Sequence, residues 1–365
     1  MRLFVVLNEQ EPRTHVDVYD ALDKLVGNGD IGDYKVYPFV FRLHSGAKNR
    51  EVVDEITGTI HAYEPELVLF SHTGQLDIEY DTLRKLRVQH PTTVFAYRDG
   101  DIYHPFYKPM PREIFGILSN CSVSFWCGYD LYAKKTERFC KDRRYVPLST
   151  DPVRFSRNRG GDEKEFDVVM IGNLSRSKIP FKSFPGGAER VKLAMSMHKL
   201  LGDKFAVFGK GWKGMDFCRG PVAFGEQGTM YGRARIALGN NNLHASYYFS
   251  DRLPIALGSG VLMAHNYEEG IESPFADIGY NLFFKDVQQA RQLVRNLLET
   301  SQDEIDKTAL RYSTFSLQKL TMEFCMKYMV DVMKSCYFSN SRTNIPAEIT
   351  NPWLGGIMLT PYTNQ

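Results

Sequence analysis

Several side chains able to accept a proton stand directly after apolar runs of the chain. The apolar run at 67–71 is followed by His72, and the run at 93–97 is followed by Asp99 and Asp101. A carboxylate or a neutral imidazole can take the proton of a hydroxyl group, so Asp101, Asp99 and His72 are candidates for a general base or for hydroxyl binding. His15, ahead of the first helix-like stretch, is a further candidate base. For a lone histidine the ordinary alternative is a surface or core residue.

Three other loops combine basic side chains with glycine or with the start of a helix. They are Gly172-Asn173-Leu174-Ser175-Arg176-Ser177-Lys178, Gly209-Lys210-Gly211-Trp212 and Tyr248-Phe249-Ser250-Asp251-Arg252. Glycine lets the backbone approach a phosphate closely, and helix-terminal N–H groups favour an anion. We expect Ser250 or Asp251 to cap the helix that begins there, with Arg252 contacting a diphosphate. The alternative for Arg252 is an ion pair with a nearby carboxylate.

The elements that must position these residues follow from hydrophobic patterning. Continuous apolar runs, typical of buried parallel strands, occur at 3–7, 67–71, 93–97, 123–127, 166–172, 205–208, 234–239, 260–264 and 281–284. Helix-like stretches, such as 16–26 and 287–299, alternate with these runs, so the sequence predicts an α/β protein with parallel sheets. Ligands of such sheets bind beyond the carboxyl ends of the strands, where the loops described above lie. Trp212 and Tyr248 could stack on a ligand there, although core packing is the simpler role for each.

The length of 365 residues favours two domains over one. Prolines, a glycine pair and mixed charges within 143–167 indicate the join. We therefore predict a first domain at 1–150, a second at 151–335, and a tail at 336–365 that packs back on the domains. An apolar stripe at 317, 320, 324, 328 and 332 predicts one long final helix, belonging to the second domain.

Charge and cysteine content restrict the class of protein. The formal net charge of +2 argues against a polyelectrolyte-type nucleic-acid binder, but residues 154–219 hold 14 basic against 7 acidic side chains. That local surplus favours an anionic ligand. The six cysteines match no zinc or redox spacing, so no metal site is expected. With no signal-peptide pattern and no apolar stretch of 18 residues, we expect a cytoplasmic protein without a membrane span.

Several segments between about 145 and 300 resemble the GT-B glycosyltransferases. Tyr-Val-Pro-Leu-Ser-Thr-Asp-Pro-Val-Arg-Phe at 145–155 is similar to the linker into their donor domain, and Asp-Val-Val-Met-Ile-Gly at 167–172 to its first strand. The segments that resemble the group-1 and spore-maturation (CgeB-like) branch are 235–239, 250–252, 256–264, 268–272 and 281–286. The first half of the chain resembles the family only in its architecture.

This resemblance implies two Rossmann-like domains facing a central cleft, with a nucleotide-diphospho-sugar in the C-terminal domain and the acceptor in the N-terminal one. It carries Arg252 over as a diphosphate contact and Glu272 as a possible donor contact. The predicted donor-binding residues are Gly172, Asn173, Arg176, Lys210, Trp212, Tyr248, Ser250, Asp251, Arg252 and Glu272. Arg176, Lys210 and Arg252 would stabilise the leaving diphosphate, so no metal or other cofactor is expected.

The predicted reaction is transfer of a hexose or pentose from a UDP-, GDP- or dTDP-sugar to an acceptor hydroxyl. A glycan is the expected acceptor, and a modified nucleic-acid base is the alternative. Many retaining relatives carry two glutamates eight positions apart, whereas the second such position here is Ile255, so retention or inversion stays open. The rival functions are a GT-B-shaped sugar-nucleotide epimerase and a non-catalytic two-domain ligand-binding protein.

Overall fold

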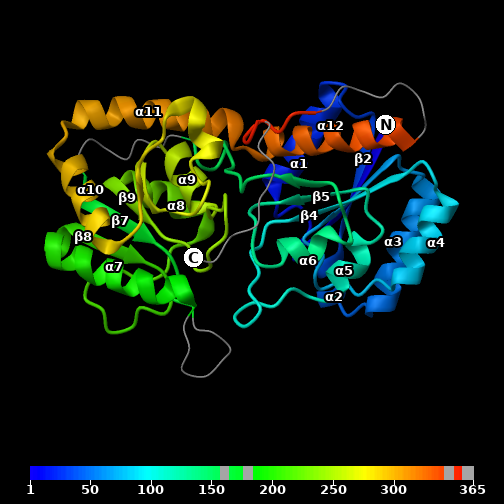
Figure 1. The fold of residues 1–365 in the computed structure, drawn as a ribbon, viewed down its shortest axis with the longest axis horizontal. Helices are drawn as coiled ribbons and strands as arrows, with labels where there is room; N and C mark the ends of the chain where they lie inside the picture. The colour runs from blue at the N-terminus through cyan, green and yellow to red at the C-terminus, as the bar shows by residue number, and fades with distance from the viewer. Residues whose placement is uncertain (157–163, 176–183, 341–348, 356–365) are drawn as a thin grey trace. The chain divides into compact units, whose positions relative to one another are not determined.

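The computed structural model describes residues 1–156, 164–175, 184–340 and 349–355. It contains two compact units, one formed by Met1–Pro147 with Met322–Gln365 and the other by Leu148–Thr321. Each unit has its own parallel β-sheet, six strands in the first and five in the second (Figure 1). The predicted alternation of strands and helices is therefore present in both halves of the chain.

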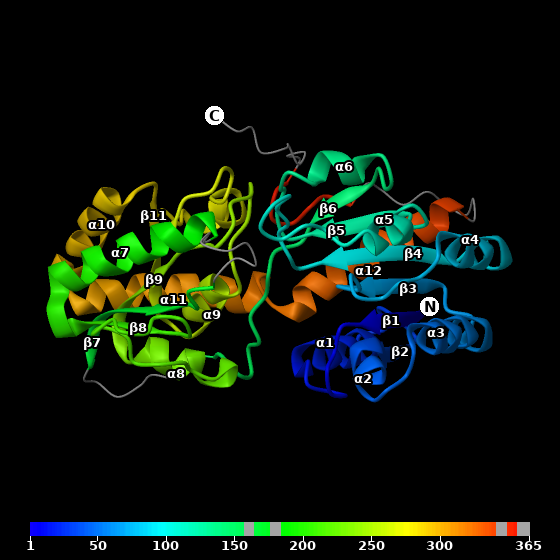
Figure 2. The same cartoon turned by 90° about the horizontal axis from the view of Figure 1, so that it is seen from below.

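The sheet of the first unit has the strand order β2-β1-β3-β4-β5-β6, and every neighbouring pair is parallel. Its strands are β1 (Arg2–Leu7), β2 (Asp33–Pro38), β3 (Leu67–Ser71), β4 (Val94–Asp99), β5 (Val123–Trp126) and β6 (Arg143–Tyr145). Its helices are α1 (Val16–Gly27), α2 (Phe39–His44), α3 (Asn49–Tyr63), α4 (Tyr80–Gln89), α5 (Glu113–Leu118), α6 (Ala133–Glu137) and α12 (Met322–Asn340). Side chains of α2 to α5 share one apolar core with alternate residues of the central strands. Figure 2 shows the strands of this sheet and the helices that belong to it.

The final helical stretch differs from the sequence expectation. It is divided into α11 (Gln302–Lys319) and α12, and α12 belongs to the first unit, whereas residues up to 335 were predicted to belong to the second domain. α12 packs against α1 and against the strands β3 to β5, and Lys24 pairs with Glu323 across the helix contact at 2.5 Å. The apolar positions of this stripe that lie in α12 do form part of its buried face, but their periodicity does not predict which sheet they pack against.

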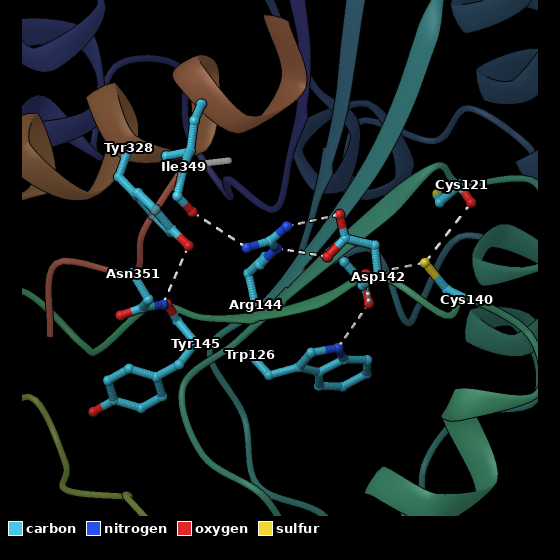
Figure 3. Close-up of polar contacts among 10 residues, drawn as sticks. Cys121, Trp126, Cys140, Asp142, Arg144, Tyr145, Tyr328, Ile349 and Asn351 are labelled. Carbon is cyan, nitrogen blue, oxygen red and sulfur yellow. Dashed lines mark hydrogen bonds and ion pairs between the residues drawn. The ribbon is translucent and has the colours of Figure 1, made fainter. Parts of the chain in front are cut away.

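The described part of the C-terminal tail covers the edge strand β6 (Figure 3). The guanidinium group of Arg144 donates to the carbonyl oxygen of Ile349 at 3.3 Å, and the amide of Asn351 donates to the carbonyl oxygen of Tyr145 at 2.8 Å. Trp353 is buried with its ring edge-on to those of Tyr145 and Tyr328. An uncovered strand edge invites pairing with other chains, and these contacts block it here.

The sheet of the second unit has the order β11-β10-β9-β7-β8, again with parallel neighbours. Its elements are β7 (Phe166–Ile171), α7 (Pro185–Leu201), β8 (Phe205–Phe208), α8 (Gln227–Gly232), β9 (Ala234–Gly239), α9 (Arg252–Gly258), β10 (Leu262–Asn266), β11 (Phe283–Phe284), α10 (Val287–Glu299) and α11. Helices α7 and α10 share a core with the sheet, and Asp286 caps α10 by accepting the N–H of Gln289. No helix among the described residues combines the length and apolar character needed to cross a membrane.

Candidate functional site

A cluster of proton-accepting side chains lies at the carboxyl end of the first sheet. β3 and β4 are parallel neighbours, so His72, just past β3, meets Asp99 at the end of β4. The Nδ1 atom of His72 lies 2.8 Å from Asp99 Oδ1, and its Nε2 atom lies 3.3 Å from Asp101 Oδ2. His72 has a φ of 56°, which is uncommon for a residue other than glycine. Its N–H donates to the carbonyl oxygen of Arg98, and its carbonyl accepts the amide of Asn8, so both backbone groups are fixed.

Asp99 is the buried anchor of this cluster, and none of its side chain is exposed. Besides His72 it accepts the hydroxyl of Tyr97 at 2.6 Å and that of Tyr103 at 2.7 Å. Burial alone would raise the pKa of Asp99, but the hydrogen bonds from His72 and the two tyrosines outweigh it and lower that pKa. Asp99 is therefore an ionised group that orients His72 and does not itself reach a substrate.

His72 is the side chain of the cluster best placed to move a proton. Burial tends to lower its pKa, but the hydrogen bond and charge of Asp99 and the charge of Asp101 raise it above its ordinary value. When His72 is neutral, a proton on Nδ1 satisfies Asp99 and leaves Nε2 as the acceptor. The ammonium of Lys108 lies 2.6 Å from Asp101 and limits the rise in the pKa of His72.

The same three residues are the one group within the described parts of the chain whose ligand atoms are close enough to hold a metal ion. Their contacts argue for proton handling instead. Asp99 already accepts hydrogen bonds from both tyrosines, and a cation would have to displace the ammonium of Lys108 from Asp101.

His15 lies next to this cluster without contacting it directly. Its Nε2 atom is 3.1 Å from the carbonyl oxygen of Asn8, whose own side chain binds the backbone of His72. The N–H of His15 donates to the buried carboxylate of Glu9. The structure thus brings three of the four candidate catalytic residues into contact and connects the fourth through Asn8.

Two glycine loops at the carboxyl end of the second sheet press against each other. A Cβ atom on Gly209 would overlap with the carbonyl of Gly172, and one on Gly211 (φ 92°) would overlap with that of Leu174. Asn173, which is exposed, accepts the backbone N–H of Lys210 at 2.8 Å. Only glycine allows this close approach of the two loops.

The other predicted donor residues differ in how they are placed. Trp212 is 1% exposed and donates its indole N–H to the carbonyl of Gly172, so it packs in the core and cannot stack on a ligand. Tyr248 is partly exposed, and Glu272 is exposed and weakly bonded to Tyr267 at 3.4 Å. Arg176 lies outside the described residues.

The start of α9 is not capped in the way the sequence suggests. Neither Ser250 nor Asp251 makes a side-chain cap hydrogen bond, and Asp251 has helical backbone angles. Pro254 does lie in the first turn, where its missing N–H costs nothing. Because α9 has only seven residues, its N-terminus alone does not make an anion site, and the charge of Arg252 is the stronger attraction for an anion.

Two arginines of the second unit carry charges that repel each other, Arg190 next to Gly172 and Arg252 at the start of α9. Arg190, on α7 and 1% exposed, donates to the carbonyl oxygen of Asn173 at 2.6 Å and to that of Asn240. Burial, then the charge of Arg252, lowers the pKa of Arg190 to about 9. Arg252 has a buried Nε atom with no hydrogen-bond partner, and neither arginine forms an ion pair within the described residues. Two uncompensated charges of the same sign favour an anionic ligand.

A buried ionic cluster that sequence reasoning missed holds the loop after β9. Glu268 is buried and accepts from His244 at 2.9 Å and from the amides of Asn241 and Asn266. Hydrogen bonds to Glu189 and to Glu268 raise the pKa of His244 to about 10. The cluster fixes the segment that includes Asn240, and therefore one of the two carbonyl partners of Arg190.

Comparison with known proteins gives this geometry a context. Residues 190–331 match the model of a family described as glycosyl transferase-like. Among solved structures, HepE from Anabaena in complex with UDP and glucose has a TM-score of 0.58 at 10% identity, covering 92% of this chain and 100% of its own. Sucrose-phosphate synthase from Thermosynechococcus elongatus has a TM-score of 0.57 at 10% identity, covering 93% and 100%. A glycosyltransferase from Rickettsia africae has a TM-score of 0.57 at 9% identity, covering 94% and 99%.

The chain has the GT-B fold. The predicted fold class is thus confirmed, with the two parallel-sheet units as the Rossmann-like parts of the GT-B architecture. No curated protein matches the sequence closely. The segment that matches the family model contains Arg190, Arg252 and the ionic cluster of His244 and Glu268.

Proposed function

We propose that the protein transfers a sugar from a nucleotide-diphospho-sugar to an acceptor hydroxyl. The observation that carries this proposal is the pair of uncompensated guanidinium groups, Arg190 and Arg252, beside the glycine loops of the second unit. The structures of HepE contain UDP, glucose and UDP-glucose, so UDP-glucose is the first donor to test, ahead of GDP- and dTDP-sugars. The CgeB-like branch remains the sequence-based prediction for the subfamily.

In this proposal the second unit binds the donor. Arg252 contacts the diphosphate, with support from Lys210, and Arg190 holds the loops at Asn173 and Asn240 in place. When the bond between the anomeric carbon and the diphosphate oxygen breaks, its electron pair stays on that oxygen. The basic side chains stabilise the resulting charge, so the proposal assigns no metal ion to this step.

The first unit activates the acceptor. The acceptor oxygen forms the new bond to the anomeric carbon, and its proton passes to Nε2 of neutral His72. Asp99 stabilises the imidazolium that forms, because it is ionised and bonded to Nδ1. Asp101, which is partly exposed next to Nε2, binds the acceptor hydroxyl. Whether the sugar keeps or inverts its anomeric configuration follows from product analysis.

The direct test is to incubate the protein with UDP-, GDP- and dTDP-sugars and to measure nucleotide release with and without acceptor extracts. An isomerised donor without transfer would indicate the epimerase, and binding without turnover would indicate the ligand-binding protein. Absence of both turnover and ligand-induced thermal stabilisation with every donor would contradict the proposal.

Arg252→Ala tests the donor site. We expect it to weaken donor binding or turnover by about 1.5–3 kcal/mol, the range for hydrogen bonds to charged groups. Arg295→Ala, on the exposed part of α10, removes the same charge elsewhere in this unit and should change neither. Unchanged donor affinity and turnover in folded Arg252→Ala would remove Arg252 from the site.

A further inference from the structure

An exposed aromatic turn follows the candidate base cluster in the first unit. The turn, His104–Lys108, is closed by an antiparallel bridge in which each end residue donates its N–H to the carbonyl of the other, at 2.8 and 3.0 Å. Phe106 at its tip is 74% exposed. Its ring is therefore accessible to a ligand.

The turn is held in one shape by its own residues. The Nδ1 atom of His104 accepts the N–H of Phe106 at 3.2 Å and faces that of Tyr107 at 3.4 Å. The His104 ring lies 4.7 Å from the ring of Tyr107 and 6.0 Å from that of Phe106, between ring centroids. Burial lowers the pKa of His104, which favours the neutral ring that this hydrogen bond to Nδ1 requires. The aromatic surface is therefore ordered before any ligand arrives, which reduces the entropy lost on binding.

The turn is also connected directly to the base cluster. Its last residue, Lys108, pairs with Asp101 at 2.6 Å and lies over the ring of Tyr103, 5.5 Å from the centroid. Tyr103 in turn donates its hydroxyl to Asp99, the anchor of His72. The aromatic turn is therefore joined by a direct contact to Asp101, which lies next to Nε2 of His72.

We propose that the aromatic turn is the acceptor subsite and that it takes the apolar face of a neutral sugar ring. This inference rests on the proposed function and names the acceptor class, a saccharide. A pyranose presents C–H groups on one face and hydroxyls around its rim. The C–H face packs on Phe106, as apolar groups pack on aromatic rings, and a rim hydroxyl binds Asp101.

Charge favours a neutral saccharide over a nucleic acid. The segment Asp101–Pro111 contains one acidic and one basic residue, Asp101 and Lys108, and these two pair with each other. A site for a nucleic-acid strand combines stacking aromatics with unpaired basic groups that follow the phosphates. The aromatic turn has the stacking surface without that positive charge.

The test compares Phe106→Ala with Val88→Ala, because Val88 on α4 is also 74% exposed and lies outside the turn. In the transfer assay, we expect Phe106→Ala to raise the KM for the saccharide acceptor roughly 5–10-fold, the scale of one aromatic contact. The affinity for donor, the thermal midpoint and the pH profile should be unchanged, and Phe106→Tyr should restore the KM. Val88→Ala should behave as the original protein.

A second measurement does not depend on turnover. Immobilised neutral gluco-, galacto- and manno-oligosaccharides and single-stranded DNA and RNA are each probed for binding to the original protein and to Phe106→Ala. Saccharide binding that depends on Phe106 supports the subsite even if no donor is turned over, in which case only the transferase proposal fails. If donors are turned over but Phe106→Ala leaves both the acceptor KM and saccharide binding unchanged, the proposed subsite is wrong. Phe106-dependent binding of nucleic acid alone would overturn it as well.

Discussion

The charge next to His72 gives a prediction that can be worked from the geometry. Asp101→Asn removes a negative charge 3.3 Å from Nε2 of His72. Both side chains are more than a third exposed, 38% for His72 and 35% for Asp101, so a dielectric close to that of water applies. The interaction is then about 1 kcal/mol, which corresponds to roughly 0.5–1 pH unit in the pKa of His72.

The sign follows from the direction of the shift. Asp101 raises the pKa of His72, and transfer in our proposal needs the neutral imidazole, so kcat/KM should rise with pH through a midpoint above 6.5. In Asp101→Asn the pKa of His72 falls, and the midpoint moves down by about 0.5–1 pH unit. Lys108 acts in the opposite direction, so Lys108→Gln should move the midpoint up.

The assay is the pH dependence of kcat/KM for the three proteins, with Asp81→Asn on α4 as a control that removes a carboxylate outside the cluster. Asp101→Asn should also reduce transfer more than donor binding. A midpoint that is unchanged, or that moves the same way in Asp101→Asn and Lys108→Gln, would refute His72 as the base. Equal loss of transfer and donor binding would assign Asp101 a structural role.

Two further predictions concern the second unit. Gly209→Ala should lower the free energy of unfolding by about 1–3 kcal/mol in denaturant titrations, because the added Cβ would overlap with the carbonyl of Gly172. The control Gly58→Ala, which has open space around it in α3, should not destabilise the protein. Equal stability of the two variants would contradict the close approach of the loops. Arg190→Lys should weaken donor binding by about 1–3 kcal/mol in calorimetric titration. Residue 190 does not contact the donor in our proposal, but one ammonium group cannot reproduce the guanidinium hydrogen bonds to the carbonyls of Asn173 and Asn240. Donor affinity equal to that of the original protein would exclude a positioning role for Arg190.

Much of the architecture could be predicted because buried parallel strands read as continuous apolar runs. The strands β3, β4 and β7 start and end within two residues of the predicted runs. The fate of α12 could not be predicted in the same way. Its stripe at 324, 328 and 332 shows that one face is buried, but the partner is α1 and the first sheet, and the break at Leu320–Thr321 carries no glycine or proline signal.

The site was predictable to the extent that strand order brings strand ends together. His72 and Asp99 meet because β3 and β4 are neighbours. Tyr103 and Lys108 were missed because the path of the loop after β4 depends on its own hydrogen bonds and not on periodicity. For Arg190 a signal was present: it shares the spacing of Leu193, Ala194 and Met197, which puts an arginine on the buried face of α7.

The two strand-end clusters also differ in charge in a way that the net charge of +2 hides. In the cluster of the first unit, the carboxylates of Asp99 and Asp101 surround the imidazole of His72 and the ammonium of Lys108. The two negative charges stabilise His72 when it gains a proton. In the second unit, Arg190 and Arg252 form no ion pair with a carboxylate among the described residues. Their positive charges would stabilise a ligand that becomes more negative. Glycosyl transfer produces both at once, a proton from the acceptor and an anion from the donor. A protein that only binds the donor would need the positive charges of the second unit but no proton acceptor. The pH profile of His72 therefore tests the catalytic proposal more sharply than donor affinity does.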